Sequence, residues 1–213
     1  MHQLANPQSL QEAADHLSRH DPFLAPTIAR AGICDIVPHD RYYQRLVESI
    51  IGQQLSVKAA SSIRNRFVEL FDGVFPAPGL ILEKSVEELR SVGLSGAKVR
   101  YIQDLSLQVL EKKLVFDNFD QLSNDEIIKE LTAVKGVGEW TAHMFMMFSM
   151  GRLEILPVGD LGIKNGIMKL YGLKKLPTTD EIKKIAKKYH WHPYETVASW
   201  YVWHSLDNKP AGE

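Results

Sequence analysis

The sequence has a single cysteine, Cys34, among its 213 residues. One cysteine excludes an intrachain disulfide, and it also excludes an iron–sulfur cluster held by four cysteines. No apolar run approaches the roughly 20 residues that a membrane helix needs, and the N-terminus lacks the basic-then-apolar pattern of a signal peptide. We therefore expect no membrane partner and a location in the cytoplasm, with association to the nucleoid, or in the nucleus of a eukaryote.

The sequence also lacks an excess of charge of either sign, because 25 Lys and Arg residues offset 26 Asp and Glu residues and leave a net charge of −1. This balance argues against a protein that coats nucleic acids through bulk charge, although it is compatible with a local basic face. Alternation of apolar and polar residues, which is typical of β-strands, is not sustained anywhere in the chain. The sequence therefore predicts an all-α fold.

Apolar residues recur at helical spacing along most of the chain. Asn6 is expected to cap the first helix, and Ser85 and Ser123 are expected to open capping boxes with the acidic residues that follow them. The composition of PAPG at 76–79 indicates a linker. The helices predicted from periodicity span 7–20, 22–32, 40–53, 56–71, 85–92, a segment ending at 110, 123–134, 139–150, 159–171, 179–189 and 193–206.

A chain of this length can form one large domain or two small lobes. We expect two helical lobes, a central one at 40–155 that includes a hairpin at 131–141, and a second one built from 1–39 and 156–213. A substrate pocket is commonly found between lobes, so the active site is expected in the interlobe cleft.

The segment 131–164 carries the most informative pattern. Gly136 and Gly138 lie two residues apart between two apolar segments, as expected for a tight hairpin between helices. The segment 139–150 is strongly apolar and contains neither Pro nor Gly, which predicts a largely buried helix. Backbone N–H groups at its start would point out of the hairpin and could hold an anion, for which phosphate is the obvious candidate.

The hairpin sequence VKGVGEWTA at 134–142, followed by PVGDLGIKNG at 157–166, resembles the helix-hairpin-helix DNA glycosylases with a Gly/Pro-rich loop and a catalytic Asp, the HhH-GPD superfamily. The chain is most similar to the alkylpurine branch, DNA-3-methyladenine glycosylase II, because IIGQQLSVKAA at 50–60 and WHPYETVASWYVW at 191–203 also match it. The matched region begins near His39, so the resemblance implies a single compact glycosylase unit without the N-terminal mixed α/β domain of larger bacterial members.

This resemblance implies a monomeric DNA repair enzyme that acts on double-stranded DNA containing alkylated bases. Such an enzyme flips out purines of the 3-methyladenine or 7-methylguanine type and hydrolyses the N-glycosidic bond, which leaves an abasic site. No cofactor is required for this reaction. In the family a sodium or potassium ion is often held by hairpin backbone carbonyls, which map to Thr132, Val134 and Gly136.

Asp160 is the candidate catalytic residue. Cleavage of an N-glycosidic bond builds positive charge on the sugar, and a fixed carboxylate is an economical way to stabilise it. An Asp at a helix start is usually only an N-cap, but the hairpin upstream and the spacing to Lys164 favour catalysis here. Some relatives carry a second acid one residue earlier, where this chain has Gly159.

Trp140 bears on whether the enzyme also cuts the strand. In the glycosylases that do so, a lysine follows the GVG sequence by one residue and forms a Schiff base with the sugar. Here Trp140 stands in that position, and Lys135 lies before the glycines. The sequence therefore predicts a monofunctional glycosylase. The resemblance places Trp140 on the wall of the base pocket, whereas general burial statistics favour core packing equally.

A flipped, cationic purine should stack well on an electron-rich ring. By the resemblance, this role maps to Trp203, whereas the other aromatic residues near it are expected to form an ordinary core. A side chain must also fill the space that the base leaves. The family wedge maps to Gln53, Gln54 and Leu55, with Gln54 or Leu55 preferred, and a plain turn between helices is the alternative.

Phosphate contacts are expected from the backbone of Gly136, Gly138 and Glu139 and from the side chain of Lys164. Further contacts could come from basic residues beside the second hairpin-like turn at 92–102 and after Lys164. These additional candidates are Lys98, Arg100, Lys169, Lys174 and Lys175.

Three other functions are compatible with parts of this pattern. The hairpin could serve a non-catalytic DNA-binding module, but Asp160 and the aromatic C-terminus count against that reading. The chain could be a glycosylase for another damaged base, oxidised or mismatched, although the missing lysine and cluster cysteines argue against the common versions. An all-α scaffold in which GVG forms a simple turn would show no DNA affinity.

Overall fold

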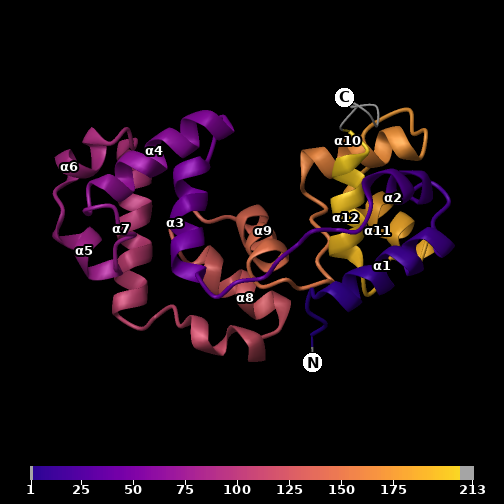
Figure 1. Cartoon of the computed structure of the whole chain (residues 1–213), viewed down its shortest axis with the longest axis horizontal. Helices are drawn as coiled ribbons and strands as arrows, with labels where there is room; N and C mark the ends of the chain where they lie inside the picture. The colour runs from indigo at the N-terminus through magenta and orange to yellow at the C-terminus, as the bar shows by residue number, and fades with distance from the viewer. Residues whose placement is uncertain (1, 207–213) are drawn as a thin grey trace. The chain divides into compact units, whose positions relative to one another are not determined.

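The structure is a computed structural model that describes residues 2–206, so residues 207–213 of the expected second lobe lie outside the described part. Within it, the only β-type pairing is an isolated antiparallel bridge between Leu4 and Arg152. The all-α prediction is confirmed (Figure 1). The helices are α1 (Pro7–His20), α2 (Ala25–Ala31), α3 (Tyr42–Gly52), α4 (Val57–Glu69), α5 (Pro78–Glu83), α6 (Val86–Ser91), α7 (Gly96–Leu110), α8 (Asn124–Thr132), α9 (Glu139–Phe148), α10 (Leu161–Leu170), α11 (Thr179–Lys188) and α12 (Glu195–His204), and a 3-10 helix, η1, spans Phe116–Gln121.

The expected helix starts are confirmed where a polar cap was predicted. Asn6 accepts a hydrogen bond from the Ser9 N–H, and capping boxes form at Ser85 and Ser123. The interpretation of 76–79 as a linker was wrong in its second half, because α5 begins at Pro78. Proline is favoured in the first turn of a helix, where its missing N–H has no intrahelical role.

The chain divides into two compact units, one of Arg41–Phe145 and one of Met1–Asp40 with Met146–Glu213. The first unit ends earlier than the expected lobe boundary at 155. The reason is that residues around Arg152 are tied to the N-terminal segment, where the Ala5 N–H donates to the Gly151 carbonyl at 2.7 Å and the Leu153 N–H to the Gln3 carbonyl at 3.2 Å.

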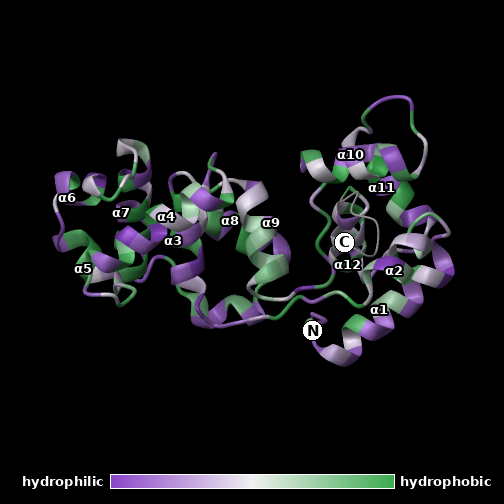
Figure 2. Cartoon of the chain, turned by 45° about the horizontal axis from the view of Figure 1, so that its top comes forward, coloured by the Kyte–Doolittle hydropathy of each residue, from purple (hydrophilic) through white to green (hydrophobic). Residues whose placement is uncertain are grey.

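The Arg41–Phe145 unit is a helical block in which α7 is central. Helices α3 and α5 both pack on α7, and α4 packs on α3. Their apolar faces meet in a core that includes Leu46, Phe67, Ile81, Ile102 and Leu105, all almost fully buried. Each of these helices carries both hydrophobic and hydrophilic residues, as amphipathic packing requires (Figure 2).

In the second unit, α1, α2 and α10–α12 surround one apolar cluster. Trp191, Trp200 and Tyr201 belong to this cluster, which confirms that they are ordinary core aromatics.

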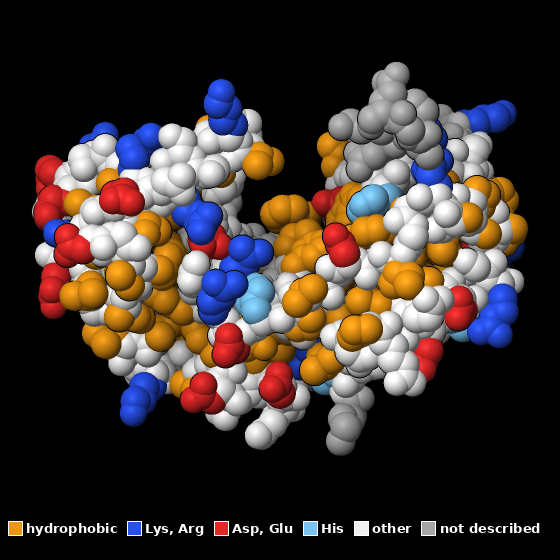
Figure 3. Space-filling view, in the orientation of Figure 1, with side chains coloured by type: hydrophobic (Ala, Val, Ile, Leu, Met, Phe, Trp, Pro, Cys, Tyr) orange, Lys and Arg blue, Asp and Glu red, His pale blue; other side chains and the backbone are white. Residues whose placement is uncertain are grey.

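Lys and Arg side chains are spread over the visible face in Figure 3 and do not form one continuous basic surface, in keeping with the small net charge. No helix among the described residues is long and apolar enough to cross a membrane.

A fully buried carboxylate, Asp21, holds the second unit together between α1 and α2. Its Oδ1 accepts the N–H groups of Phe23 at 3.0 Å and Leu24 at 3.1 Å. Its Oδ2 accepts the Trp191 indole N–H at 2.8 Å and the Tyr171 hydroxyl. Burial, and then the hydrogen bond to Asp21, raise the pKa of Tyr171 well above its usual range.

We predict that Asp21→Asn destabilises the protein by at least about 2 kcal/mol, because an amide nitrogen cannot accept the indole and hydroxyl protons that would remain buried. The measurement is urea unfolding followed by circular dichroism. The exposed Asp35→Asn in the same unit is the matched control and should leave the midpoint within experimental error. Equal midpoints for the two variants would contradict the prediction.

Candidate functional site

The hairpin lies between α8 and α9 in the Arg41–Phe145 unit. Val134 and Val137 are buried, and the Val137 N–H donates to the Val134 carbonyl at 3.1 Å. These anchors leave Gly136, Gly138 and Glu139 exposed at the start of α9. First-turn N–H groups at such a helix start can bind an anion, and the phosphate contact expected from the sequence stays a prediction.

The two hairpin glycines serve different purposes. Gly136 has a φ of +80°, and a Cβ there would come within 2.1 Å of the Tyr101 ring, so only glycine fits over that ring. A Cβ at Gly138 would meet nothing within 4 Å. The protein therefore needs no glycine at Gly138 for its own packing, and a bare backbone there suits the close approach of an external partner.

Helix α7 fixes the hairpin through Asp104. This carboxylate accepts the Lys135 N–H at 3.0 Å, the Lys135 ammonium at 3.1 Å and the Gln108 amide at 2.9 Å. Burial alone would raise the pKa of Asp104, but these hydrogen bonds outweigh it and lower the pKa below its usual value. The Gln108 amide also donates to the Ala133 carbonyl at 3.2 Å. This brace was not predicted from the sequence, although residues 101, 104 and 108 share a helical face.

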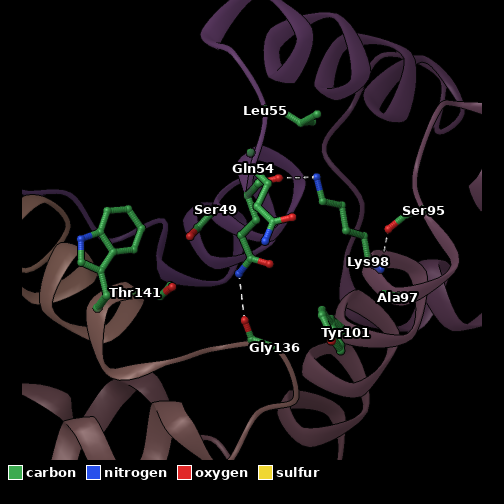
Figure 4. Close-up of a pocket in the computed structure, with 12 residues that line it drawn as sticks. Ser49, Gln54, Leu55, Ser95, Ala97, Lys98, Tyr101, Gly136 and Thr141 are labelled. Atoms are coloured by element: carbon green, nitrogen blue, oxygen red, sulfur yellow. Dashed lines mark hydrogen bonds between the residues drawn. The ribbon is translucent and has the colours of Figure 1, made fainter. Parts of the chain in front are cut away.

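The turn at the end of α3 separates the three predicted wedge residues. The Gln53 side chain is directed at the hairpin, where its amide donates to the Gly136 carbonyl at 2.8 Å (Figure 4). Gln54 has a positive φ of +57°, and both Gln54 and Leu55 are exposed. Gln53 is thus engaged within the protein, whereas the side chains of Gln54 and Leu55 are exposed to solvent.

Lys98 lies on the other side of this turn. Its ammonium donates to the Ile51 carbonyl at 2.7 Å and to the Gln53 carbonyl at 2.8 Å. Burial lowers the pKa of this ammonium below its usual value. Lys98 was expected to contact phosphate, and the structure instead places it on the last carbonyls of α3. Similarly, Lys169 donates to the Ser205 carbonyl at 3.3 Å, at the end of α12.

A cavity of about 850 Å³ adjoins the turn and the hairpin. Trp140 on its wall is 51% exposed, so the core-packing reading of this tryptophan is wrong. Figure 4 shows the labelled lining residues around the opening. The cavity is lined by Ser49, Gly52, Gln53, Gln54, Leu55, Ser95, Ala97, Lys98, Tyr101, Gly136, Trp140 and Thr141.

Asp160, in the second unit, caps α10. Its Oδ1 accepts the Ile163 N–H at 2.7 Å and the Trp203 indole N–H at 2.9 Å. The capping role weighed against catalysis is therefore present, but a cap alone would not need the second donor. Two donors on one oxygen fix the orientation of the carboxylate, which lies at the positive end of a helix dipole. Lys164 follows in the same helix and is half-buried.

Trp203 reaches Asp160 because Gly162 has no side chain. A Cβ at Gly162 would lie 2.9 Å from the Cδ1 and Nε1 atoms of Trp203 and 3.0 Å from Asp160 Oδ1. The Trp203 ring is half-buried and faces Phe148 with ring centroids 6.0 Å apart. Sequence spacing gave no sign of this requirement, because α10 and α12 are distant along the chain.

We predict that Gly162→Ala displaces the Trp203 ring from Asp160, because contacts below 3.0 Å require a shift. The change should move the Trp203 indole N–H resonance in a proton–nitrogen NMR spectrum and lower stability by about 1 kcal/mol, the size of a weakened cap. Gly159→Ala is the matched control, since a Cβ at this neighbour of Asp160 meets nothing within 4 Å. An unchanged indole resonance in Gly162→Ala would show that the Trp203 contact with Asp160 does not depend on the glycine.

No cluster of three or more His, Cys, Asp or Glu residues suited to a metal ion is found in residues 2–206. The carbonyls of Thr132, Val134 and Gly136 are the candidates for a monovalent cation. Carbonyl oxygens suit such an ion, and each keeps a lone pair besides the one used by the Gln53 amide at Gly136 or the Val137 N–H at Val134.

Comparisons with known proteins identify the family to which the chain belongs. The family model for HhH-GPD superfamily base excision DNA repair proteins matches residues 47–190. The chain is 33% identical to the alkylbase DNA glycosidase-like protein mag2 of Schizosaccharomyces pombe over 91% of this chain and 92% of that protein.

Solved structures give the same result. The crystal structure of a DNA-3-methyladenine glycosidase from Bacillus halodurans is 37% identical, with a TM-score of 0.82 over 92% of this chain and 89% of that one. The 3-methyladenine DNA glycosylase Mag1 of Schizosaccharomyces pombe, solved in complex with abasic DNA, is 32% identical, with a TM-score of 0.78 over 90% and 95%. The chain belongs to the HhH-GPD superfamily of base excision DNA repair proteins.

Proposed function

We propose that this protein is a monofunctional DNA glycosylase that removes alkylated purines, of the 3-methyladenine and 7-methylguanine type, from double-stranded DNA and leaves an abasic site. The observation that carries the proposal is the Asp160 carboxylate, held on one oxygen by Ile163 and Trp203. The relatives support the substrate class, because they are named alkylbase or 3-methyladenine glycosylases. The protein acts as a monomer.

Asp160 stabilises the charge that develops on the sugar. An alkylated purine carries a positive charge, so the electron pair of the breaking N-glycosidic bond neutralises the departing base, and no protonated acid is needed. The sugar becomes oxocarbenium-like, and the oriented carboxylate lowers its energy. A water molecule then bonds to C1′ and loses a proton to solvent or to the carboxylate, which completes the hydrolysis.

The absence of strand cleavage follows from Trp140. A lyase needs an amine that forms a Schiff base with the sugar, and Trp140 offers no such nucleophile. Lys135, the nearest lysine in sequence, is engaged with Asp104 at 3.1 Å. We propose that Trp140 and Trp203 instead provide aromatic surfaces for the flipped base.

DNA is held by the hairpin and opened by the turn after α3. In the proposal the backbone N–H groups of Gly136, Gly138 and Glu139 bind one phosphate, and Lys164 adds a charge contact. Gln54 and Leu55 occupy the space of the flipped base. The carbonyls of Thr132, Val134 and Gly136 would hold a monovalent cation, which would supply positive charge near that phosphate.

We predict that Asp160→Asn lowers the single-turnover rate of base release from methylated duplex DNA by at least about 100-fold, the usual effect of losing a preorganised charge. Asparagine can still cap α10 and accept the Trp203 proton, so the thermal midpoint should change little. The assay identifies the released base by chromatography and tests for strand breaks before and after alkali treatment.

Release of methylated purines with alkali-dependent breaks, lost in Asp160→Asn, is the expected result. Gly159→Ala serves as the control and should retain base release. Strand breaks formed without alkali would refute the monofunctional assignment. An intact protein that binds DNA but releases no base would point to the non-catalytic module or to another lesion.

A further inference from the structure

The turn at 53–55 has a backbone conformation that needs external support. Gln54 has a φ of +57°, a left-handed conformation that residues with a Cβ adopt at a cost of about 1 kcal/mol or more. Within the turn, the Leu55 N–H donates to the Gly52 carbonyl at 3.1 Å. Such a conformation persists where the surroundings determine it, and two side chains, those of Lys98 and Gln53, supply that support here.

Lys98 supports the turn from α7. The last carbonyls of a helix have no intrahelical partner and carry the negative end of the dipole. The Lys98 ammonium binds one carbonyl before the turn, that of Ile51, and one at its start, that of Gln53. Two bonds from one cation therefore fix the direction in which the chain leaves α3.

Gln53 supports the turn from the hairpin side. Its amide binds the Gly136 carbonyl at 2.8 Å, across 83 residues of sequence. The backbone of Gly136 is itself held over Tyr101 and next to the Lys135–Asp104 contact. The turn, the hairpin and α7 are thus each in contact with the other two, because Lys98, Tyr101 and Asp104 all belong to α7.

We propose that Lys98 and Gln53 are positioning residues that couple the turn at 53–55 to the phosphate-binding hairpin, so that backbone capture and base displacement occur together. This inference rests on the proposed function, since it assigns the turn to base displacement. When the hairpin binds a phosphate, the turn is already oriented, and Gln54 and Leu55 need no separate ordering step. Preorganisation of this kind lowers the cost of reaching the bound state.

The test replaces each contact while keeping side-chain size. Gln53→Met removes the bond to the hairpin, and Lys98→Met removes the two bonds to α3. Three quantities are measured for each variant: affinity for DNA that already contains an abasic site, fluorescence of 2-aminopurine placed beside a 7-methylguanine, and the single-turnover rate of base release. The abasic DNA has no base to displace, so it reports phosphate capture separately.

We expect Gln53→Met to reduce both the 2-aminopurine response and the release rate by about threefold to tenfold, the range for one neutral hydrogen bond. Lys98→Met should reduce them by about tenfold or more, because its bonds are charge-assisted. Affinity for abasic DNA should stay near that of the intact protein. Lys98→Arg should restore part of the loss, since arginine keeps several donors.

Two controls separate coupling from general effects. Gln108→Met breaks a hairpin brace of the same chemical type that does not touch the turn, so it should weaken binding to abasic and lesion DNA alike. Lys113→Met removes an exposed lysine paired with Glu111 and should change none of the three quantities. Thermal midpoints identify any variant that fails to fold, and Gln53→Met, at a partly exposed site, still tests the proposal if Lys98→Met does not fold.

The proposal is overturned if Gln53→Met and Lys98→Met match the intact protein in fluorescence response and release rate. It is also overturned if both variants lose affinity for abasic DNA as strongly as Gln108→Met, because the contacts would then serve phosphate binding by the hairpin alone. If the intact protein releases no base, the proposed function fails, while the 2-aminopurine response still reports on coupling.

Discussion

The hydrogen bond from the Trp203 indole to Asp160 depends on how closely α12 approaches α10. Two glycines on one face of α10 permit that approach: a Cβ at Gly162 would lie 2.9 Å from the Trp203 ring, and a Cβ at Gly166 would lie 2.5 Å from a Val202 side-chain atom and 2.7 Å from its carbonyl. The spacing of four residues places both on the same side of the helix. The orientation of the Asp160 carboxylate therefore depends on the lack of side chains at Gly162 and Gly166 as well as on its two hydrogen-bond donors.

The hairpin is held by a different device. Its own backbone hydrogen bonds define a tight turn. Its position is fixed by hydrogen bonds from side chains of α7 and from Gln53 at the end of α3. Polar side chains satisfy the inner carbonyls and N–H groups, so the outward N–H groups of α9 can be committed to an external anion. A hairpin held rigidly in this way is suited to the phosphate-binding role proposed for it.

Local sequence patterns predicted the features whose causes are local. Capping boxes, the glycine hairpin and the position of Asp160 before a helix all depend on residues within a few positions of one another, and the structure contains them. The resemblance to the HhH-GPD family, carried by the spacing between the hairpin and Asp160, is confirmed.

The support for these features was not predictable, because its contacts join residues far apart. The Gln53 amide and the Gly136 carbonyl are 83 positions apart, and the Trp203 indole and Asp160 are 43 apart. Lys98 was expected to contact phosphate because it lies beside the second hairpin-like turn, whereas in the fold its ammonium binds the carbonyls of Ile51 and Gln53. For Trp140, burial statistics for large apolar residues offered core packing as an equal alternative, but the side chain is exposed in the structure.

The buried carboxylate of Asp21 has a consequence for the order in which the molecule is built. The Arg41–Phe145 unit is continuous in sequence, so it can form its core while the rest of the chain is still being synthesised. The contacts of Asp21 with the hydroxyl of Tyr171 and the indole of Trp191 can form only after 150 and 170 further residues, respectively, have been made. Until those residues have been made, water hydrates the Asp21 oxygen that they later bind, so the core of the second unit can be completed only late in synthesis.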